Sequence, residues 1–240
     1  MTRPAPAVAV ALLLLASGCL GAVGPLDGGS APDVASLVTE MDAADARDLV
    51  ARHRATLANA SSYAGWYERD ENDTLAYKHR VVVDRDDRQF VRDWRNVSTA
   101  SGVVFRNASG TYERSRRPGD ESFRYEVRTG DSARFDADDS FAFDLPLPDP
   151  EVLAGYDFEY VRSTDTLHYF RADGPDADGA ADVTDARARL VVHEDGYLRS
   201  LSWTVTVERG KEPTTLTRET TVVALNTTDA DRPDWMGAVA

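Results

Sequence analysis

All five asparagines of the chain begin an N-x-S/T triplet, which is the acceptor sequence for N-linked glycosylation: Asn59, Asn72, Asn96, Asn107 and Asn226. If positions are independent, the chance of five out of five is on the order of 10⁻⁴ or less. Asparagine followed by serine or threonine is also favoured in turns, so turn chemistry is the alternative explanation. Glycosylation would require all five side chains to lie on the outer surface.

Cys19, the one cysteine, follows an N-terminal segment with the layout of an export signal. Arg3 is its positive start, residues 5–16 are its apolar core, and small residues lead to the cysteine. The apolar run is too short for a transmembrane helix, which needs about 20 residues. The stretch LASGC resembles the lipobox of prokaryotic lipoproteins, although Ala16 stands where leucine is usual. This resemblance implies that Cys19 becomes the lipidated first residue of the mature chain. The alternative is a plain secretory signal with a chance cysteine.

The composition narrows the range of partners. The chain has 29 Asp and 12 Glu against 25 Arg and only two Lys, for a formal charge of −14. Such a charge argues against nucleic-acid binding and against electrostatic docking on anionic lipid, so membrane attachment would need a covalent lipid. Asp-rich, lysine-poor usage resembles the proteomes of haloarchaea, with an ordinary acidic protein as the alternative.

No catalytic motif stands out. The histidines His53, His79, His168 and His193 are scattered without zinc-ligand spacing. The sequence also lacks a G-x-S-x-G elbow and a glycine-rich phosphate loop. We therefore predict a protein that is not an enzyme, and keep a hydrolase that uses two of the 41 acidic residues as a minor alternative.

Two clusters of aspartates have the look of calcium loops. They lie at 136–139 and 173–182. The second cluster lacks both the D-x-D-x-D-G order and the closing glutamate of an EF-hand. We interpret both clusters as solvated loops, and we expect no metal site and no cofactor.

Residues 42–60 show helical periodicity. Asp42 or Asp45 can cap the helix, and the residues that recur at helical spacing are Ala46, Leu49, Val50, His53 and Leu57. From Tyr63 onward the period changes to two, as in residues 75–83, 123–127 and 201–207, with turn signals between the segments. About ten strands in hairpin order predict a large antiparallel sheet, which tends to curl.

A proline-rich stretch at 135–155 separates the two groups of strands. Its three prolines are incompatible with a strand, and Asp149 followed by Pro150 can start a short helix with proline at the first helical position. We predict an α+β fold with an N-terminal helix, a large curved antiparallel sheet and a short central helix. The predicted organisation is a signal peptide at 1–18, a lipidated cysteine with a flexible tether at 19–41, and a single domain at 42–240.

The layout of the whole chain resembles that of haloarchaeal lipoproteins. The features that carry this resemblance are the lipobox, the acidic tether, the first helix, the strands that open at 63–67, the proline-rich break and the closing Pro233-Asp234-Trp235. These are similar in layout to the LolA/LppX-type lipoproteins, which implies a half-barrel that holds a lipid or another apolar ligand between sheet and helix. No ligand-binding side chains carry over from that family.

The strand pattern offers its own candidates for such a site. A curved sheet covered by one or two short helices leaves apolar volume on its concave side. We expect six aromatic residues to face inward and line it: Tyr77, Phe90, Trp94, Phe123, Tyr125 and Trp203. The predicted function is a lipid-anchored protein on the extracellular face of the cell membrane that binds or carries an apolar ligand. The alternative is a structural or interaction module of the archaeal cell envelope whose core is filled by side chains.

Overall fold

The computed structural model describes residues 34–136, 145–174, 183–209 and 212–238. Within them, one antiparallel sheet dominates the fold. Its strands are β1 (Ser62–Glu71), β2 (Thr74–Asp84), β3 (Gln89–Asn96), β4 (Ala100–Asn107), β5 (Gly110–Arg116), β6 (Arg124–Arg128), β7 (Glu159–Ser163), β8 (Leu167–Asp173), β9 (Val183–His193), β10 (Leu198–Arg209) and β11 (Glu212–Leu225).

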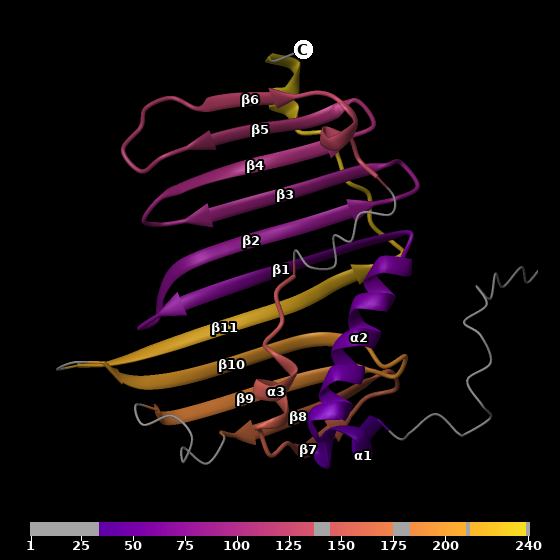
Figure 1. Cartoon of the computed structure of the whole chain (residues 1–240), viewed down its shortest axis with the longest axis vertical. Helices are drawn as coiled ribbons and strands as arrows, with labels where there is room; N and C mark the ends of the chain where they lie inside the picture. Colours follow the sequence, from indigo (N-terminus) through magenta and orange to yellow (C-terminus); the bar gives the residue numbers. More distant parts are fainter. Residues whose placement is uncertain (1–33, 137–144, 175–182, 210–211, 239–240) are drawn as a thin grey trace, which may run out of the picture. The chain divides into compact units, whose positions relative to one another are not determined.

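The strand order shows how two meanders form one sheet. The order is β6-β5-β4-β3-β2-β1-β11-β10-β9-β8-β7, so each group of consecutive strands is a run of hairpins. The two groups meet where the first strand pairs with the last, for example Tyr67 with Thr220. Strands β6 and β7 are the two edges, and the sheet is open and curved (Figure 1).

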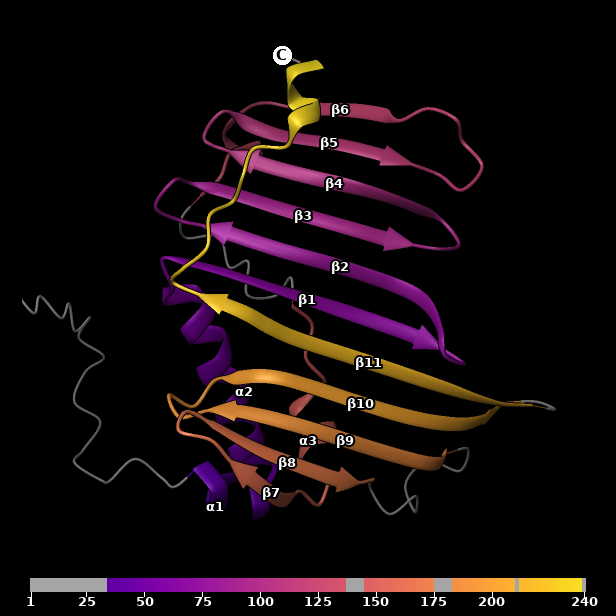
Figure 2. The ribbon, with the colours of Figure 1, turned by 180° about the vertical axis from the view of Figure 1, so that it is seen from behind.

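Helices cover one face of the sheet. They are α1 (Val34–Thr39), α2 (Ala43–Asn59) and α3 (Pro150–Ala154), with short 3₁₀ helices η1 (Asp131–Ala133) and η4 (Asp234–Ala238). All three α-helices lie on the near side of the sheet in Figure 1 and behind it in Figure 2. Val38 of α1 is buried in the same cluster as α2, so the packed residues begin before position 42.

The core lies between the helices and the sheet and consists of two clusters. One joins α1, α2 and α3 to strands β8–β10 and includes Leu49, Phe170 and Leu201. The other joins the end of α2 to β1–β4 and β11 and includes Leu57 and Val83. The periodic residues predicted for the first helix are its buried face.

The C-terminal segment crosses the opposite face. After β11 the chain runs past the ends of β2–β5 and reaches η4 beside β6 (Figure 2). Ala230 in this segment packs against Ala64 and Val82, which point away from α2. Both faces of the central strands β1 and β2 are therefore covered at this end, one by α2 and the other by the C-terminal segment.

These features confirm the predicted fold class. The chain forms an α+β fold in which a helix precedes a large, open antiparallel sheet, and a short helix lies between the two groups of strands. The short helix begins as expected, with Pro150 in its first turn and the Asp149 carboxylate accepting a hydrogen bond from the Glu151 backbone N–H. The sheet has eleven strands rather than about ten.

Candidate functional site

Strand register decides which residues share a face. Val81 pairs with Arg92 and Val83 with Phe90, and Arg92 pairs in turn with Val104. Val81, Val83, Phe90 and Val104 pack in one cluster with Leu57 of α2, so these positions face the helix. Alternate residues of the same strands therefore face away from it, because neighbouring side chains of a strand point to opposite faces.

Register separates the six aromatic residues that the sequence places on one inner face. Tyr77, Phe90 and Trp94 fall at helix-facing positions of β2 and β3, and Trp203 faces the same way from β10. Tyr125 pairs with Arg114, which places it on the other face. Phe123 lies with it, because the guanidinium carbons of Arg114 and Arg116 are 4.6 and 5.1 Å from the centre of the Phe123 ring.

Alternation within a segment fixes which of its residues share a face, but it does not fix which face. Phe123, Tyr125 and Val127 alternate as expected, yet they lie on the outer side of the edge strand and are 40 to 47 % exposed. The expectation of a single six-residue lining is corrected accordingly. Between sheet and helix, Phe90 and Trp203 are buried in the two core clusters.

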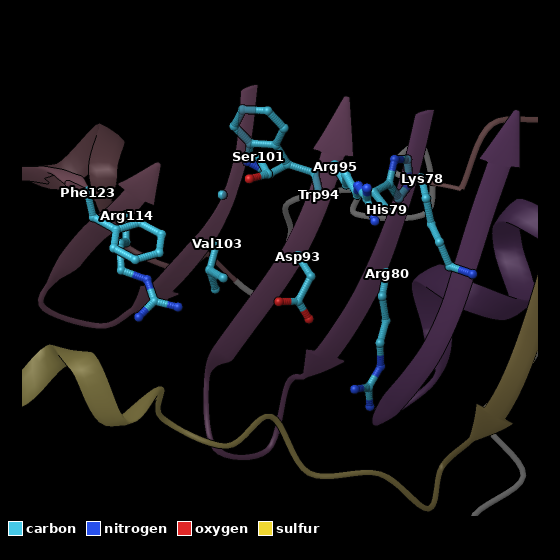
Figure 3. Close-up of a pocket in the computed structure, with 11 residues that line it drawn as sticks. Lys78, His79, Arg80, Asp93, Trp94, Arg95, Ser101, Val103, Arg114 and Phe123 are labelled. Atoms are coloured by element: carbon cyan, nitrogen blue, oxygen red, sulfur yellow. The ribbon is translucent and has the colours of Figure 1, made fainter. Parts of the chain in front are cut away.

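A pocket of about 390 Å³ has most of its lining on the face of the sheet that points away from α2. His79, Trp94 and Gly102 also line it, although register places them in the helix-facing row. Its lining residues come from β2–β5 and from the segment before β6: Lys78, His79, Arg80, Asp93, Trp94, Arg95, Ser101, Gly102, Val103, Arg114 and Phe123. Arg80, Asp93 and Arg114 extend from three different strands in the same direction (Figure 3). Val103 and Phe123 supply apolar side chains on this face.

The pocket carries an excess of positive charge. Four cationic side chains line it, against the single carboxylate of Asp93. Lys78 forms an ion pair with Glu68 (Nζ to Oε2, 2.5 Å). In the part of the chain that the structure describes, no carboxylate lies within ion-pair distance of Arg80, Arg95 or Arg114.

Aromatic rings hold Arg114 in place. Its guanidinium carbon is 4.6 Å from the Phe123 ring centre and 5.4 Å from that of Trp235, which η4 brings to this face. Arginine stacks well on aromatic faces because its delocalised cation is attracted to the ring electrons and is weakly hydrated. The Nε atom of Arg114 is buried and has no hydrogen-bond partner among the described residues.

The basic side chains of the pocket were not among the residues that the sequence singles out. Their signal lies in the same alternation that locates the strands, because Lys78 and Arg80 occupy the positions between the apolar residues of β2. Such charges ordinarily belong to a solvated face. Only the pairing of β2–β5 shows that cations from separate strands converge on one pocket.

The predicted glycosylation positions all lie at the ends of elements. Asn59 is the last residue of α2, and Asn72, Asn96, Asn107 and Asn226 end or follow strands β1, β3, β4 and β11. Asn59, Asn72 and Asn226 are exposed, and Asn96 and Asn107 are partly buried.

Four of these asparagines also have a structural role. The Oδ1 atoms of Asn96 and Asn107 accept hydrogen bonds from the backbone N–H of Ser98 and Ser109, two residues further on. Asn72 and Asn226 have positive φ angles, and their Oδ1 atoms accept bonds from the backbone N–H of Thr215 and Ser61. Local turn bonds thus account for Asn96 and Asn107, and positive φ angles with bonds to distant segments account for Asn72 and Asn226. Glycosylation of all these asparagines stays a prediction.

Several other sequence predictions concern residues that the structure does not describe. Cys19 and the signal segment lie outside the described residues, as do most residues of the two aspartate clusters. Among the residues that are described, no three His, Cys, Asp or Glu side chains are grouped so that they could hold a metal ion. No helix in this part of the chain is both long enough and apolar enough to cross a membrane.

No family model and no curated protein matches the sequence. Among solved structures, the chain is similar to the lipoprotein LppX of Mycobacterium tuberculosis, at 10 % identity and a TM-score of 0.36, over 77 % of this chain and 98 % of that one. It is also similar to a chain in the structure of the MucA/MucB complex of Pseudomonas aeruginosa, at 14 % identity and a TM-score of 0.34, over 80 % of this chain and 60 % of that one. A LolA-superfamily protein of Nitrosomonas europaea matches at 11 % identity and a TM-score of 0.21, over 80 % and 96 %. We draw no function from these likenesses.

Proposed function

We propose that this protein binds or carries an apolar, lipid-like ligand, and that the pocket on the outer face of β2–β5 receives it. The observation that carries the proposal is the cavity of about 390 Å³ beside Val103 and Phe123. Pockets for small ligands range from about 300 to 1,000 Å³ and combine apolar walls with a few polar groups. The space between sheet and helix, where the sequence places the ligand, holds two packed core clusters instead.

The driving force for such binding is removal of apolar surface from water. Each Å² of ligand and pocket surface that is buried contributes roughly 25 cal/mol. A ligand that buries about 200 Å² would therefore gain about 5 kcal/mol before the cost of immobilising it. This supports reversible exchange with a membrane or with another carrier.

The proposal includes the cell-surface location expected from the sequence. A lipid on Cys19 would hold the chain at the membrane, and glycans on the five asparagines would lie at element ends. Replacing Cys19 by serine in the full chain should move the protein from the membrane fraction to the medium. A Cys19→Ser variant that stays in the membrane fraction would refute the anchor.

Lipid content tests the carrier role directly. The full chain, purified without added lipid, is extracted with organic solvent and the extract is analysed by mass spectrometry. We expect a lipid at a fixed ratio to protein, and a lower ratio in Phe123→Ala, which removes an apolar wall of the pocket. Tyr160→Ala is the matched control, because Tyr160 is a similarly exposed aromatic residue near the opposite edge. Lipid-free protein, or equal loss in both variants, would contradict the proposal.

A second candidate function is a structural or interaction module of the cell envelope. The two clusters of buried side chains between α2 and the sheet favour it, since such side chains can take the place of a ligand. Every residue of both edge strands is exposed, and each edge presents large apolar side chains, such as Val127 on β6 and Val161 on β7. Exposed edges of this kind can pair with a strand from another chain. Binding of a partner by a lipid-free protein would favour this module.

A further inference from the structure

The chain has an uneven charge distribution. Residues 74–128, which span β2 to β6, contain twelve Lys and Arg side chains against eight Asp and Glu, a formal charge of +4. The whole chain carries −14, so the remaining residues carry −18. One part of a strongly acidic protein is therefore basic, and the pocket lies within it.

Like charges face each other across the pocket strands. Lys78 of β2 pairs in register with Arg95 of β3, and Arg95 pairs with Ser101, which pairs with Arg116 of β5. Directly opposed residues on neighbouring strands lie about 5 Å apart at Cβ, and like charges at that spacing destabilise a sheet. Glu68 offsets part of this repulsion through its ion pair with Lys78. Arg95 and Arg116 have no carboxylate within ion-pair distance among the described residues.

A second row of pocket residues lies beside the first. Arg80 pairs with Asp93, Asp93 with Val103, and Val103 with Arg114. The row thus has an arginine at each end, with one carboxylate and one apolar side chain between them, and the Arg114 guanidinium at one end stacks on Phe123. Cationic and apolar side chains are therefore direct neighbours on this face.

We propose that the pocket over β2–β5 is selective for an amphiphile with an anionic head group, such as a phosphate-bearing lipid. Lys78, Arg80 and Arg95 contact the head group, and the apolar part lies against Val103 and Phe123. An anion placed between Lys78 and Arg95 relieves their repulsion, and arginine donates paired hydrogen bonds to phosphate oxygens. This inference rests on the proposed function and adds the ligand's charge to it.

Short-chain lipids test the charge selectivity. The full chain is titrated by calorimetry with monomeric dihexanoylphosphatidylglycerol, which is anionic, with dihexanoylphosphatidylcholine, which is zwitterionic, and with inorganic phosphate. The lowest salt at which circular dichroism shows an intact fold is used, because salt screens exposed charges. We expect the anionic lipid to bind about tenfold or more tightly than the zwitterionic one, the equivalent of one charge-assisted hydrogen bond.

Variants then assign the selectivity to the pocket. Arg95→Gln and Arg80→Gln should each weaken binding of the anionic lipid about tenfold. Both lipids carry a phosphate, so binding of the zwitterionic lipid should weaken too, but by less, because its choline cation offsets the phosphate charge. Arg189→Gln is the matched control, since Arg189 is an exposed arginine of β9 on the same face, outside this pocket. It should bind both lipids as the unmodified chain does.

The outcomes separate this inference from the proposed function. If both lipids bind equally and the arginine variants change nothing, the charge selectivity is wrong and the carrier role stands. If neither lipid binds, both are wrong. If inorganic phosphate binds as tightly as the anionic lipid, the pocket is a simple anion site. The proposal that it selects an amphiphile is then wrong.

Discussion

His53 is a histidine in the core. It lies on α2, is 1 % exposed and belongs to the buried face of that helix. Burial disfavours the imidazolium and lowers the pKa of His53 from 6.5 to about 4. The folded protein therefore binds this proton less readily than the unfolded chain does.

That pKa predicts a loss of stability in acid. Above pH 6.5 the ring is neutral in both states, and as pH falls from 6.5 toward 4 only the unfolded chain gains the proton. The unfolding free energy should drop by about 2 kcal/mol at pH 5 from this group. Urea denaturation at several pH values checks this. His53→Leu should have a shallower pH dependence than the unmodified chain, and equal slopes in the two proteins would contradict the assignment.

Asn226 offers a way to separate structure from glycosylation. Its Oδ1 atom accepts hydrogen bonds from both the N–H and the hydroxyl of Ser61, and its φ is +57°. Asn226→Ala loses both bonds and strains the backbone, so we expect about 1–2 kcal/mol of destabilisation. Asn226→Asp keeps an acceptor of the same shape and should stay near the unmodified stability while losing the sequon. Denaturation and intact mass of both variants are the measurements, and equal destabilisation by Ala and Asp would contradict the role of Oδ1.

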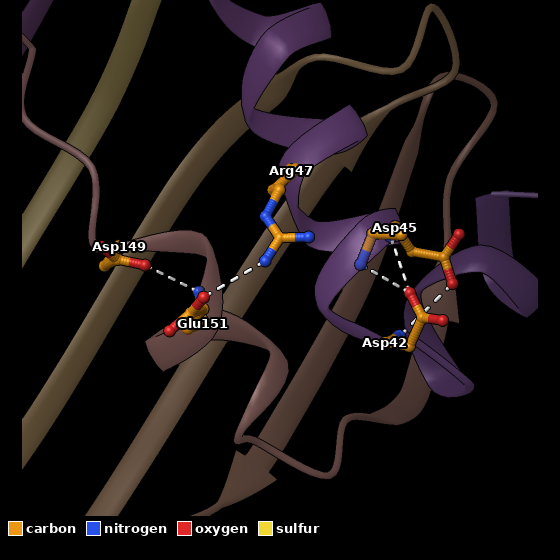
Figure 4. A network of polar contacts seen from close by, with 6 residues as sticks. Asp42, Asp45, Arg47, Asp149 and Glu151 are labelled. Atoms are coloured by element: carbon orange, nitrogen blue, oxygen red, sulfur yellow. Dashed lines mark hydrogen bonds and ion pairs between the residues drawn. The ribbon is translucent and has the colours of Figure 1, made fainter.

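The start of α2 depends on a reciprocal pair of aspartates. The Asp42 carboxylate accepts hydrogen bonds from the backbone N–H of Ala44 and Asp45, and the Asp45 carboxylate accepts one from the N–H of Asp42 (Figure 4). Arg47 of the same helix forms an ion pair with Glu151 of α3 (Nη2 to Oε1, 3.2 Å). The sequence leaves open which aspartate caps the helix, and the structure uses both.

Removing the cap should destabilise the fold by a modest, measurable amount. Asp42→Ala leaves two backbone donors without their side-chain acceptor and should lower the urea midpoint. Asp48→Ala is the control, because Asp48 is an exposed aspartate of the same helix outside the cap. Urea midpoints of the two variants give the answer. A loss in Asp48→Ala as large as that in Asp42→Ala would show that the effect is one of charge.

Elements with strong local signals could be predicted from the sequence. The helix at 42–60 and the strand at 75–83 have clear periods, and both are present as α2 and β2. The Asp149-Pro150 start of α3 is equally local. The pairing of β1 with β11 has no local signal, because it joins Tyr63 to Leu225, far along the chain. The face of the sheet on which an alternating segment places its apolar side chains depends on such long-range pairing. For this reason the sequence alone could not place Phe123 and Tyr125.

At the scale of the whole molecule, net charge proved a poor guide to local charge. The net charge of −14 argues against anionic partners. Residues 74–128 nevertheless carry a formal charge of +4, and four of their cationic side chains line one pocket. Composition averages over the chain, whereas a binding site senses only the charges within about a Debye length, roughly 10 Å at 0.1 M salt. Register between strands, which composition does not contain, decides where the cations meet.

The acidic remainder of the chain predicts how stability responds to salt. A net charge of −18 outside residues 74–128 predicts net repulsion within that part of the folded chain. Burial is the main cause that raises the pKa of Glu219, the Thr221 hydroxyl and Lys78 lower it, and the neighbouring Glu68 and Asp70 raise it through repulsion of the kind expected here. Salt screens these interactions over the range from about 0.1 M to about 1 M. Stability should therefore rise across that range of potassium chloride.

Urea is the right denaturant for this measurement because it is uncharged, whereas guanidinium is itself a salt. The expected result is a urea midpoint that increases with potassium chloride and then levels off once the charges are screened. Glu219→Gln removes one of the crowded carboxylates and should have a higher midpoint than the unmodified chain at low salt, with the difference shrinking as salt increases. A midpoint that is flat or falls with salt would mean that attraction between the two oppositely charged parts, and not repulsion within the acidic one, governs the electrostatics of this fold.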